Sequence, residues 1–163
     1  MTAFQVARDA GSVFVGVAGL ANMKNAPVLD AFLQAEANAE QLTVCIDMAR
    51  CTGMDSTFMG LLVGTSAGLK AHGGRLVVVN PSETCLKLLD MLGVSSVLPV
   101  VQQCTVPDLA FVDLPDGVAA VGAMQRMELI RRAHHALMDV NAENHAKFSA
   151  FITALEADLA KLK

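Results

Sequence analysis

Residues 42–48 read Leu-Thr-Val-Cys-Ile-Asp-Met, and this short apolar run predicts a central strand that is covered on both faces. The sequence around it alternates between helix and strand patterns. Upstream, Pro27 opens an amphipathic helix that we expect to end near Glu40. Downstream, a second helix follows Asp55 and ends at residues 72–74, and residues 75–80 predict another buried strand.

The same alternation continues toward both ends of this region. Residues 4–7 and 13–19 predict a β-hairpin. Residues 81–92 predict a third helix that Gly93 ends, and residues 97–101 predict a last strand, which Pro99 favours at a sheet edge. The sequence therefore predicts an α/β domain over residues 1–104, in which helices pack on a small mixed β-sheet with right-handed parallel connections.

The character of the sequence changes after Cys104. Residues 105–117 contain Pro107, Pro115 and Gly117 and predict a linker, with a short strand at residues 109–112. Residues 118–163 predict a helical extension, either one long helix or a helical hairpin in which Asn141 caps the second helix. The apolar seam of this extension must pack on the domain, on itself or on a second copy, and we expect a homodimer.

Composition and charge exclude several classes of function. The formal net charge is −4 and the twelve lysines and arginines form no basic stripe, so nucleic acid is not an expected partner. No apolar stretch reaches the roughly 20 residues that cross a bilayer, and the first residues do not resemble a signal peptide. We therefore expect a cytoplasmic protein without a membrane partner.

The reactive side chains form no catalytic or metal-binding pattern. The four cysteines lack a C-x-x-C pair and are expected to be buried, reduced thiols. His134 lies on an apolar helical seam, His135 follows it, and His145 comes a few turns later. No carboxylate or thiol completes a site with them, so we expect surface histidines. We accordingly predict no metal, no cofactor and no enzymatic activity.

Four segments within residues 1–102 resemble the STAS domain, the fold of anti-sigma factor antagonists. These segments are residues 19–27 (GLANMKNAP), 54–60 (MDSTFMG), 73–82 (GGRLVVVNPS) and 88–100, where LLDMLGV is followed by VLPV. The resemblance implies a phospho-regulated protein-binding switch that acts in transcription regulation. It also implies the partners, a serine kinase of the histidine-kinase-like ATPase class that doubles as an anti-sigma factor, and a phosphatase that resets the switch.

In this resemblance, residues 54–60 correspond to the phosphoacceptor loop. It implies Ser56 as the phosphoacceptor, with Thr57 as the fallback. The residues that it implies as partner contacts are Asn22, Lys24, Asp55, Phe58 and Met59. The family usually has an acid at position 22 and a glycine at position 58, so the Phe58 ring is expected either on the surface that partners contact or in the core.

A phosphate at this place is physically reasonable. Asp55 or Ser56 can cap the second helix, and capping alone is the simpler hypothesis for both. A phosphoserine adds roughly −1.5 to −2 charges. The N-terminus of a helix tolerates such a charge, whereas a docked partner is repelled by it.

Two further hypotheses for the function remain open. The first is a constitutive scaffold, in which the helical extension assembles the protein without phosphorylation. The second is a module that binds a small ligand such as a lipid or a nucleotide. A stripe of Gly60, Gly64 and Gly68 on the second helix predicts either close packing of that helix on the sheet or a shallow groove for a partner.

Overall fold

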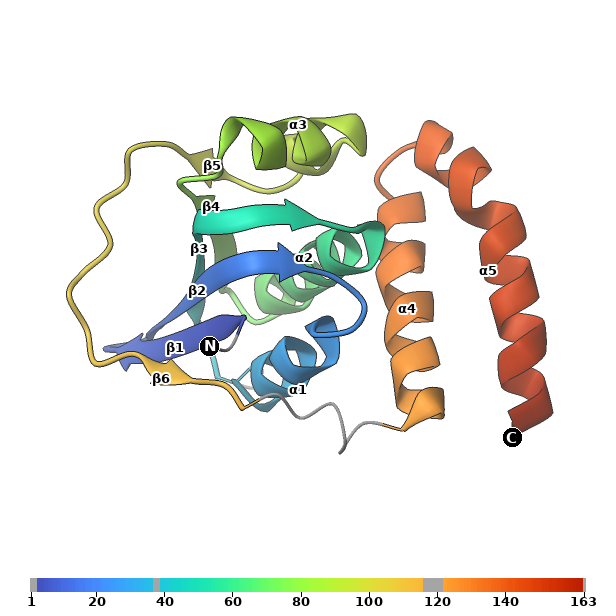
Figure 1. The fold of residues 1–163 in the computed structure, drawn as a ribbon, viewed down its shortest axis with the longest axis horizontal. Coiled ribbons are helices and arrows are strands. Elements are labelled where there is room, and N and C mark those ends of the chain that lie inside the picture. Colours follow the sequence, from blue (N-terminus) through green and yellow to red (C-terminus); the bar gives the residue numbers. More distant parts are fainter. Residues whose placement is uncertain (1–2, 37–38, 116–121, 163) are drawn as a thin grey trace.

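The chain alternates strands and helices up to residue 101 and ends in two long helices (Figure 1). The computed structural model describes residues 3–36, 39–115 and 122–162. The strands are β1 (Phe4–Asp9), β2 (Ser12–Ala21), β3 (Thr43–Met54), β4 (Arg75–Val79), β5 (Val100–Val101) and β6 (Val112–Asp113). The helices are α1 (Ala26–Glu36), α2 (Ser56–Ala71), α3 (Glu83–Met91), the 3-10 turn η1 (Val94–Ser96), α4 (Ala123–Met138) and α5 (Ala142–Leu162).

The six strands form one mixed sheet in the order β5-β4-β3-β2-β1-β6. Strands β2 to β5 pair in parallel, whereas β1 pairs antiparallel with both β2 and β6. The predicted α/β fold with helices on a small mixed β-sheet is therefore confirmed. β5 lies at one edge, as Pro99 predicted. β6 lies at the other edge, at Val112–Asp113 rather than at residues 109–112.

β3 is longer than its apolar run predicts. It continues to Met54 instead of ending at Met48. Beyond Asp47 it no longer pairs with β4 and pairs with β2 alone, through two register shifts. Arg50 and Thr52 are exposed in this part, which explains why the apolar pattern stops early. The extension brings the end of β3 level with the end of β2.

Two other predicted boundaries are wrong. α1 ends at Glu36 rather than near Glu40. The turn η1 follows α3, so the last strand begins at Val100 instead of residue 97. Gly93 adopts a φ of 71°, a left-handed conformation that ends α3 and that glycine reaches without strain.

One face of the sheet carries most of the hydrophobic core. Along β2, the side chains of Val13, Val15 and Val17 are buried and alternate with half-buried neighbours. In the central strand β3, Ile46 is fully buried but Asp47 is only half-buried. The cover of β3 on both faces, which its sequence predicted, is therefore partial.

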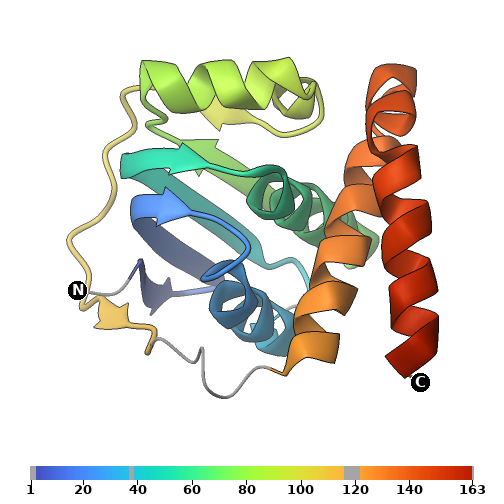
Figure 2. The same ribbon diagram turned by 45° about the vertical axis from the view of Figure 1, so that its right-hand side comes forward.

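The C-terminal extension is a helical hairpin, which decides between the two predicted arrangements. α4 and α5 run antiparallel, and α4 lies between α5 and the helices of the domain (Figure 2). The turn is at residues 139–141, and Oδ1 of Asn141 accepts the backbone N–H of Asn144 at 2.7 Å, which is the predicted cap. The apolar side of α4 packs on the domain of its own chain, where Leu129 and Leu137 join the core.

Candidate functional site

The candidate site lies where two parallel strands end. Ala21 at the end of β2 pairs with Met54 at the end of β3. The carboxyl ends of parallel strands meet at one edge of a sheet, so the loop after β2 and the start of α2 are neighbours. The backbone N–H of Asp55 donates to the carbonyl of Ala21 at 3.1 Å and joins the two segments directly.

The carboxylate of Asp55 joins the loop after β2 to the start of α2. Oδ1 accepts the backbone N–H of Phe58 at 2.9 Å and thereby caps α2. Oδ2 accepts the backbone N–H of Met23 at 2.8 Å. Of the two predicted caps, Asp55 rather than Ser56 has this role, and it fixes the loop after β2 against the helix.

The loop after β2 is ordered by its own asparagines. Oδ1 of Asn22 accepts the N–H of Lys24 at 2.9 Å, and Oδ1 of Asn25 accepts the N–H of Asn22 at 3.0 Å. These bonds turn the side chains of Met23 and Lys24 outward, and 46% of Met23 is exposed. Leu20, at 61% exposure, adds a second apolar side chain beside them.

Leu20 and Met23 were not among the sequence-predicted contact residues. Both lie within the segment 19–27 that resembles the STAS turn, so the signal was present. Exposed apolar patches rimmed by polar residues mark surfaces that bind protein, and Leu20 and Met23 add apolar area beside polar residues at this edge. The predicted contacts Asn22 and Lys24 lie on the same loop, with Asn22 half-buried and Lys24 exposed.

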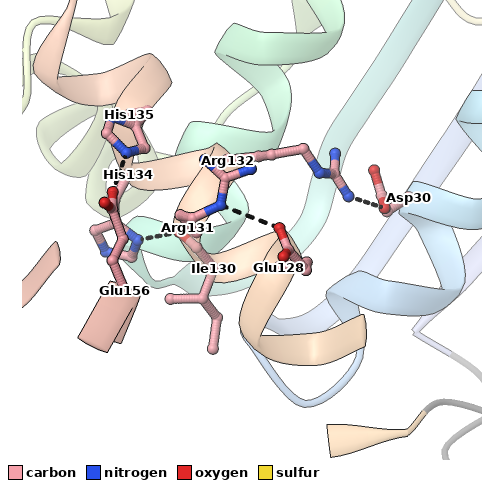
Figure 3. A network of polar contacts seen from close by, with 8 residues as sticks. All are labelled: Asp30, Glu128, Ile130, Arg131, Arg132, His134, His135 and Glu156. Atoms are coloured by element: carbon pink, nitrogen blue, oxygen red, sulfur yellow. Dashed lines mark hydrogen bonds and ion pairs between the residues drawn. The ribbon is translucent and has the colours of Figure 1, made fainter. Parts of the chain in front are cut away.

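Ser56 is the first residue of α2 and is half-buried. Its Oγ lies 2.9 Å from Nε2 of His134 on α4. Nδ1 of His134 lies 2.7 Å from the backbone carbonyl of Ile130, which can only accept (Figure 3). In the neutral ring Nδ1 therefore carries the proton, and Nε2 accepts the hydroxyl proton of Ser56.

His134 is a site residue that the sequence placed wrongly. We expected a surface histidine, but only 3% of His134 is exposed. Burial lowers its pKa from the ordinary value, against the opposing effects of the Ile130 carbonyl and the Asp55 charge, and this keeps the ring neutral. The signal was its position on an apolar seam with Ile130 and Leu137, which indicates an inward-facing side chain.

Three predicted site residues lie in the interior. Phe58 is fully buried and stacks on Phe4 with ring centroids 6.1 Å apart and planes 7° apart. Thr57 and Met59 are also buried, at 3% and 4% exposure. The prediction of partner contacts at Phe58 and Met59 disagrees with this burial, because α2 turns both side chains inward. Thr57 is likewise withdrawn from the surface.

The glycine stripe of α2 packs against a helix, not against the sheet. A Cβ on Gly60 would lie 2.1 Å from the carbonyl oxygen of Ala133 on α4. A Cβ on Gly64 would lie 3.8 Å from Cβ of Ala136. The prediction of helix-on-sheet packing is therefore wrong, and the glycine at position 60 permits α4 to cross α2 at backbone contact.

The other reactive side chains do not gather at this site. Cys45, Cys51 and Cys85 are free and buried, and burial raises the pKa of Cys45 to about 11 and that of Cys51 to about 12. Cys104 is partly exposed, contrary to expectation. Within the described ranges, no three His, Cys, Asp or Glu side chains are placed to hold a metal ion. No described helix is both long and apolar enough to cross a bilayer.

Comparison with known proteins covers the domain and not the hairpin. Residues 4–102 match the family model described as "Mlab, STAS domain". The anti-sigma-B factor antagonist of Bacillus subtilis (strain 168) is 33% identical over 97 residues, which are 58% of this chain and 86% of that protein.

Solved structures agree with this match at the level of the fold. The anti-sigma factor antagonist SpoIIAA in its unphosphorylated form superimposes with a TM-score of 0.53 at 24% identity, over 62% of this chain and 90% of that one. The Bacillus cell fate determinant SpoIIAA in its phosphorylated form gives 0.52 at 23% identity, over 62% and 93%. The matched fold is the mixed sheet with its packed helices.

Proposed function

Because the chain belongs to the STAS domain family, we propose that it is a protein-binding switch that antagonises an anti-sigma factor in the cytoplasm. Relatives named as anti-sigma factor antagonists support the general role. The observation that carries the proposal is the double hydrogen bond of Asp55, which joins the loop after β2 to the start of α2. The two segments thereby form one preorganised surface.

We call this surface the switch face and define it by Asn22, Met23, Lys24, Asp55 and Ser56. It combines an exposed apolar side chain, one cation and one carboxylate over a backbone that hydrogen bonds hold in place. A preorganised surface loses little conformational entropy on binding, which favours a specific protein partner. The partner that we propose is a serine kinase of the histidine-kinase-like ATPase class.

Ser56 is the proposed phosphoacceptor of the switch face. Its Oγ would attack the γ-phosphorus of ATP, ADP would leave, and the hydroxyl proton would pass to a base of the kinase. A phosphatase would restore the hydroxyl by hydrolysis. The product dianion would lie at the N-terminus of α2, which stabilises negative charge, beside the carboxylate of Asp55. A partner docked on the switch face would meet both charges.

Phosphorylation mapping tests this proposal. The full chain is incubated with ATP and a histidine-kinase-like serine kinase encoded beside it, and the product is mapped by mass spectrometry. We expect one phosphate, on Ser56, and none in the Ser56→Ala variant. Label that is confined to other residues would refute Ser56 as the acceptor.

Binding to the same kinase is measured separately, because it does not require phosphate transfer. Lys24→Glu and Met23→Asp alter exposed side chains of the switch face and should each weaken the complex about tenfold or more, as central contacts of an interface do. Lys87→Glu serves as the control, because this exposed lysine lies on α3, outside the switch face. Equal affinities for all four proteins would argue against this surface.

The homodimer remains a second proposal, supported by exposed apolar side chains on α5. Phe151 is 47% exposed and Leu162 is 52% exposed, although α5 packs on α4 of its own chain. Sedimentation of the full chain and of the Leu162→Asp variant tests it. A dimer that the substitution dissociates supports assembly through α5, and a monomeric wild-type chain contradicts it.

A further inference from the structure

The C-terminal hairpin, residues 123–162, packs on the face of α2 that begins with Ser56. α4 crosses α2 at Gly60, one turn from Ser56, where backbone touches backbone at Ala133. In both views α4 lies along the domain and α5 lies outside it (Figures 1 and 2). This hairpin follows the matched residues 4–102, so it is an addition to the family domain.

The hydroxyl of Ser56 is engaged by the hairpin. It donates to Nε2 of His134, whose ring lies between α2 and α5. On the α5 side, the rings of Phe148 and Phe151 contact that of His134 edge-on, with centroids 5.0 Å away in each case. The hydroxyl of the proposed phosphoacceptor Ser56 therefore points toward α4 and not toward solvent. A kinase that approaches Ser56 would contact α4 first.

The hairpin is also attached to α1 and α3. Arg132 pairs with Asp30 of α1 at 2.9 Å, as Figure 3 shows. At the hairpin turn, Nδ2 of the buried Asn144 donates to the carbonyls of Leu92, just after α3, and Leu137 of α4, at 2.8 and 2.9 Å. These contacts fix the orientation of the hairpin over all three helices of the domain.

Between these contacts, the packing of α4 on α1 and α2 is incomplete. A groove of about 200 Å³ runs between α1, α2 and α4, and it is bordered by Leu33, Gly64 and Arg132 among others. On α4, Nε of Arg126 is buried with no hydrogen-bond partner among the described residues. Unfilled volume and an unsatisfied donor both lower the stability of a packed interface. The packing between the hairpin and the domain is therefore locally defective beside α1, although Leu129 and Leu137 of α4 belong to the same hydrophobic core as the domain.

We propose that the C-terminal hairpin is a built-in competitor that covers Ser56 at one end of the switch face, with the Ser56–His134 hydrogen bond as its latch. The partner kinase binds, and reaches Ser56, only in molecules whose hairpin has left α2. This inference rests on the proposed function of the switch face, and it names how access to that face is regulated.

The test uses one pair of matched substitutions in the full chain. Gly60→Ala adds a methyl group that cannot fit unless α4 moves. Gly68→Ala adds the same group to the same helix, where no described atom beyond the neighbouring residues and backbone of that helix lies within 4 Å of the new Cβ. Both changes favour helix formation equally, so a difference between them reports the position of α4.

Hydrogen exchange read by mass spectrometry measures opening without a partner. In Gly60→Ala, amides of residues 123–162 should exchange about 5- to 150-fold faster, which is the range by which over-packing typically shifts such an equilibrium. Amides of β2, β3 and β4 should keep wild-type protection, and Gly68→Ala should match wild type throughout. Unchanged exchange in Gly60→Ala overturns the inference, as does loss of strand protection in step with the hairpin.

Phosphorylation of Ser56 by the same kinase then separates the two proposals. We expect faster labelling of Gly60→Ala than of wild type and Gly68→Ala. If exchange shows an open hairpin but labelling rates are equal, the competitor is refuted and the phosphoswitch stands. If exchange shows opening but no variant is labelled or bound, the proposed function fails while the hairpin remains a releasable unit.

Discussion

Ser56 Oγ and His134 Nε2 lie 2.9 Å apart although 78 positions separate the two residues in the chain. The bond connects the first residue of α2 with the buried side of α4. It therefore couples the proposed phosphoacceptor to the docking of the hairpin.

Acid should loosen the hairpin through His134. Burial lowers the pKa of the ring in the docked state below its ordinary value of 6.5. The released or unfolded state then binds more protons as the pH falls below about 6.5, so docking is at full strength above that value and weakens until the lowered pKa is reached. Hydrogen exchange of α4 and α5 between pH 8 and pH 5 (roughly the range in which histidine titrates) measures this.

The matched control for the acid effect is His134→Gln. Glutamine can accept the Ser56 proton but does not titrate, so its pH dependence should be smaller than that of wild type. The other charged groups near the ring, Asp55 and His135, are unchanged in this variant. Identical pH profiles for the two proteins would show that His134 is not the source of the effect.

Asp55→Ala should destabilise the domain by about 1–2 kcal/mol, because the cap of α2 is lost together with the bond to Met23. Asp55→Asn retains a side-chain oxygen for the cap and should lose less. Urea denaturation followed by circular dichroism gives both values. Equal losses for the two variants would mean that the cap itself adds little, because both variants lose the charge and the bond to Met23.

Phe58→Ala should cost about 3–5 kcal/mol, as expected for an aromatic ring removed from a packed core. Met23→Ala, on the exposed loop, should change stability by less than about 0.5 kcal/mol. Thermal or urea unfolding compares the two. If Phe58→Ala is nearly neutral, the ring is not the core residue that its burial indicates.

Asn144→Ala removes the buried amide that joins the hairpin turn to α3. The carbonyl of Leu92 is left without that donor, so we expect a loss of about 1–3 kcal/mol, with faster exchange concentrated in α4 and α5. Glu143→Ala, at an exposed neighbouring position, is the control and should stay within about 0.5 kcal/mol of wild type. A loss spread evenly over the strands would show that the hairpin unfolds only with the domain.

The sequence predicted the fold because local patterns and topology agree in the domain. The apolar run at residues 42–48 and the turns at Gly73 and Gly93 each mark a boundary by a local physical rule. The end of β3 was missed because Arg50 and Thr52 face solvent beyond the point where β4 stops pairing. This part of β3 pairs with β2 alone, so its sequence lacks the continuous apolar pattern from which a central strand is predicted.

The site was predicted less completely, because its parts come from distant segments. Asp55 and Ser56 were found by capping chemistry and by resemblance, both of which are local. Phe58 could not be oriented, because only the packing on Phe4 decides which way its ring turns. His134 was identified on an apolar seam, but the seam alone could not reveal that Ser56 lies opposite it.

The domain and the hairpin belong to one chain, and this affects the partner concentration at which the protein can respond. Docking on α2 is an event within one molecule, so the fraction closed does not depend on how much of the protein a cell makes. The partner concentration that is needed for binding therefore depends on the fraction of molecules in which the hairpin is open. If about 1% of molecules are open, the apparent Kd for the partner is about 100-fold weaker than the intrinsic one. The close contact at Gly60, which leaves no room for a methyl group, would thus set the partner concentration at which the protein responds.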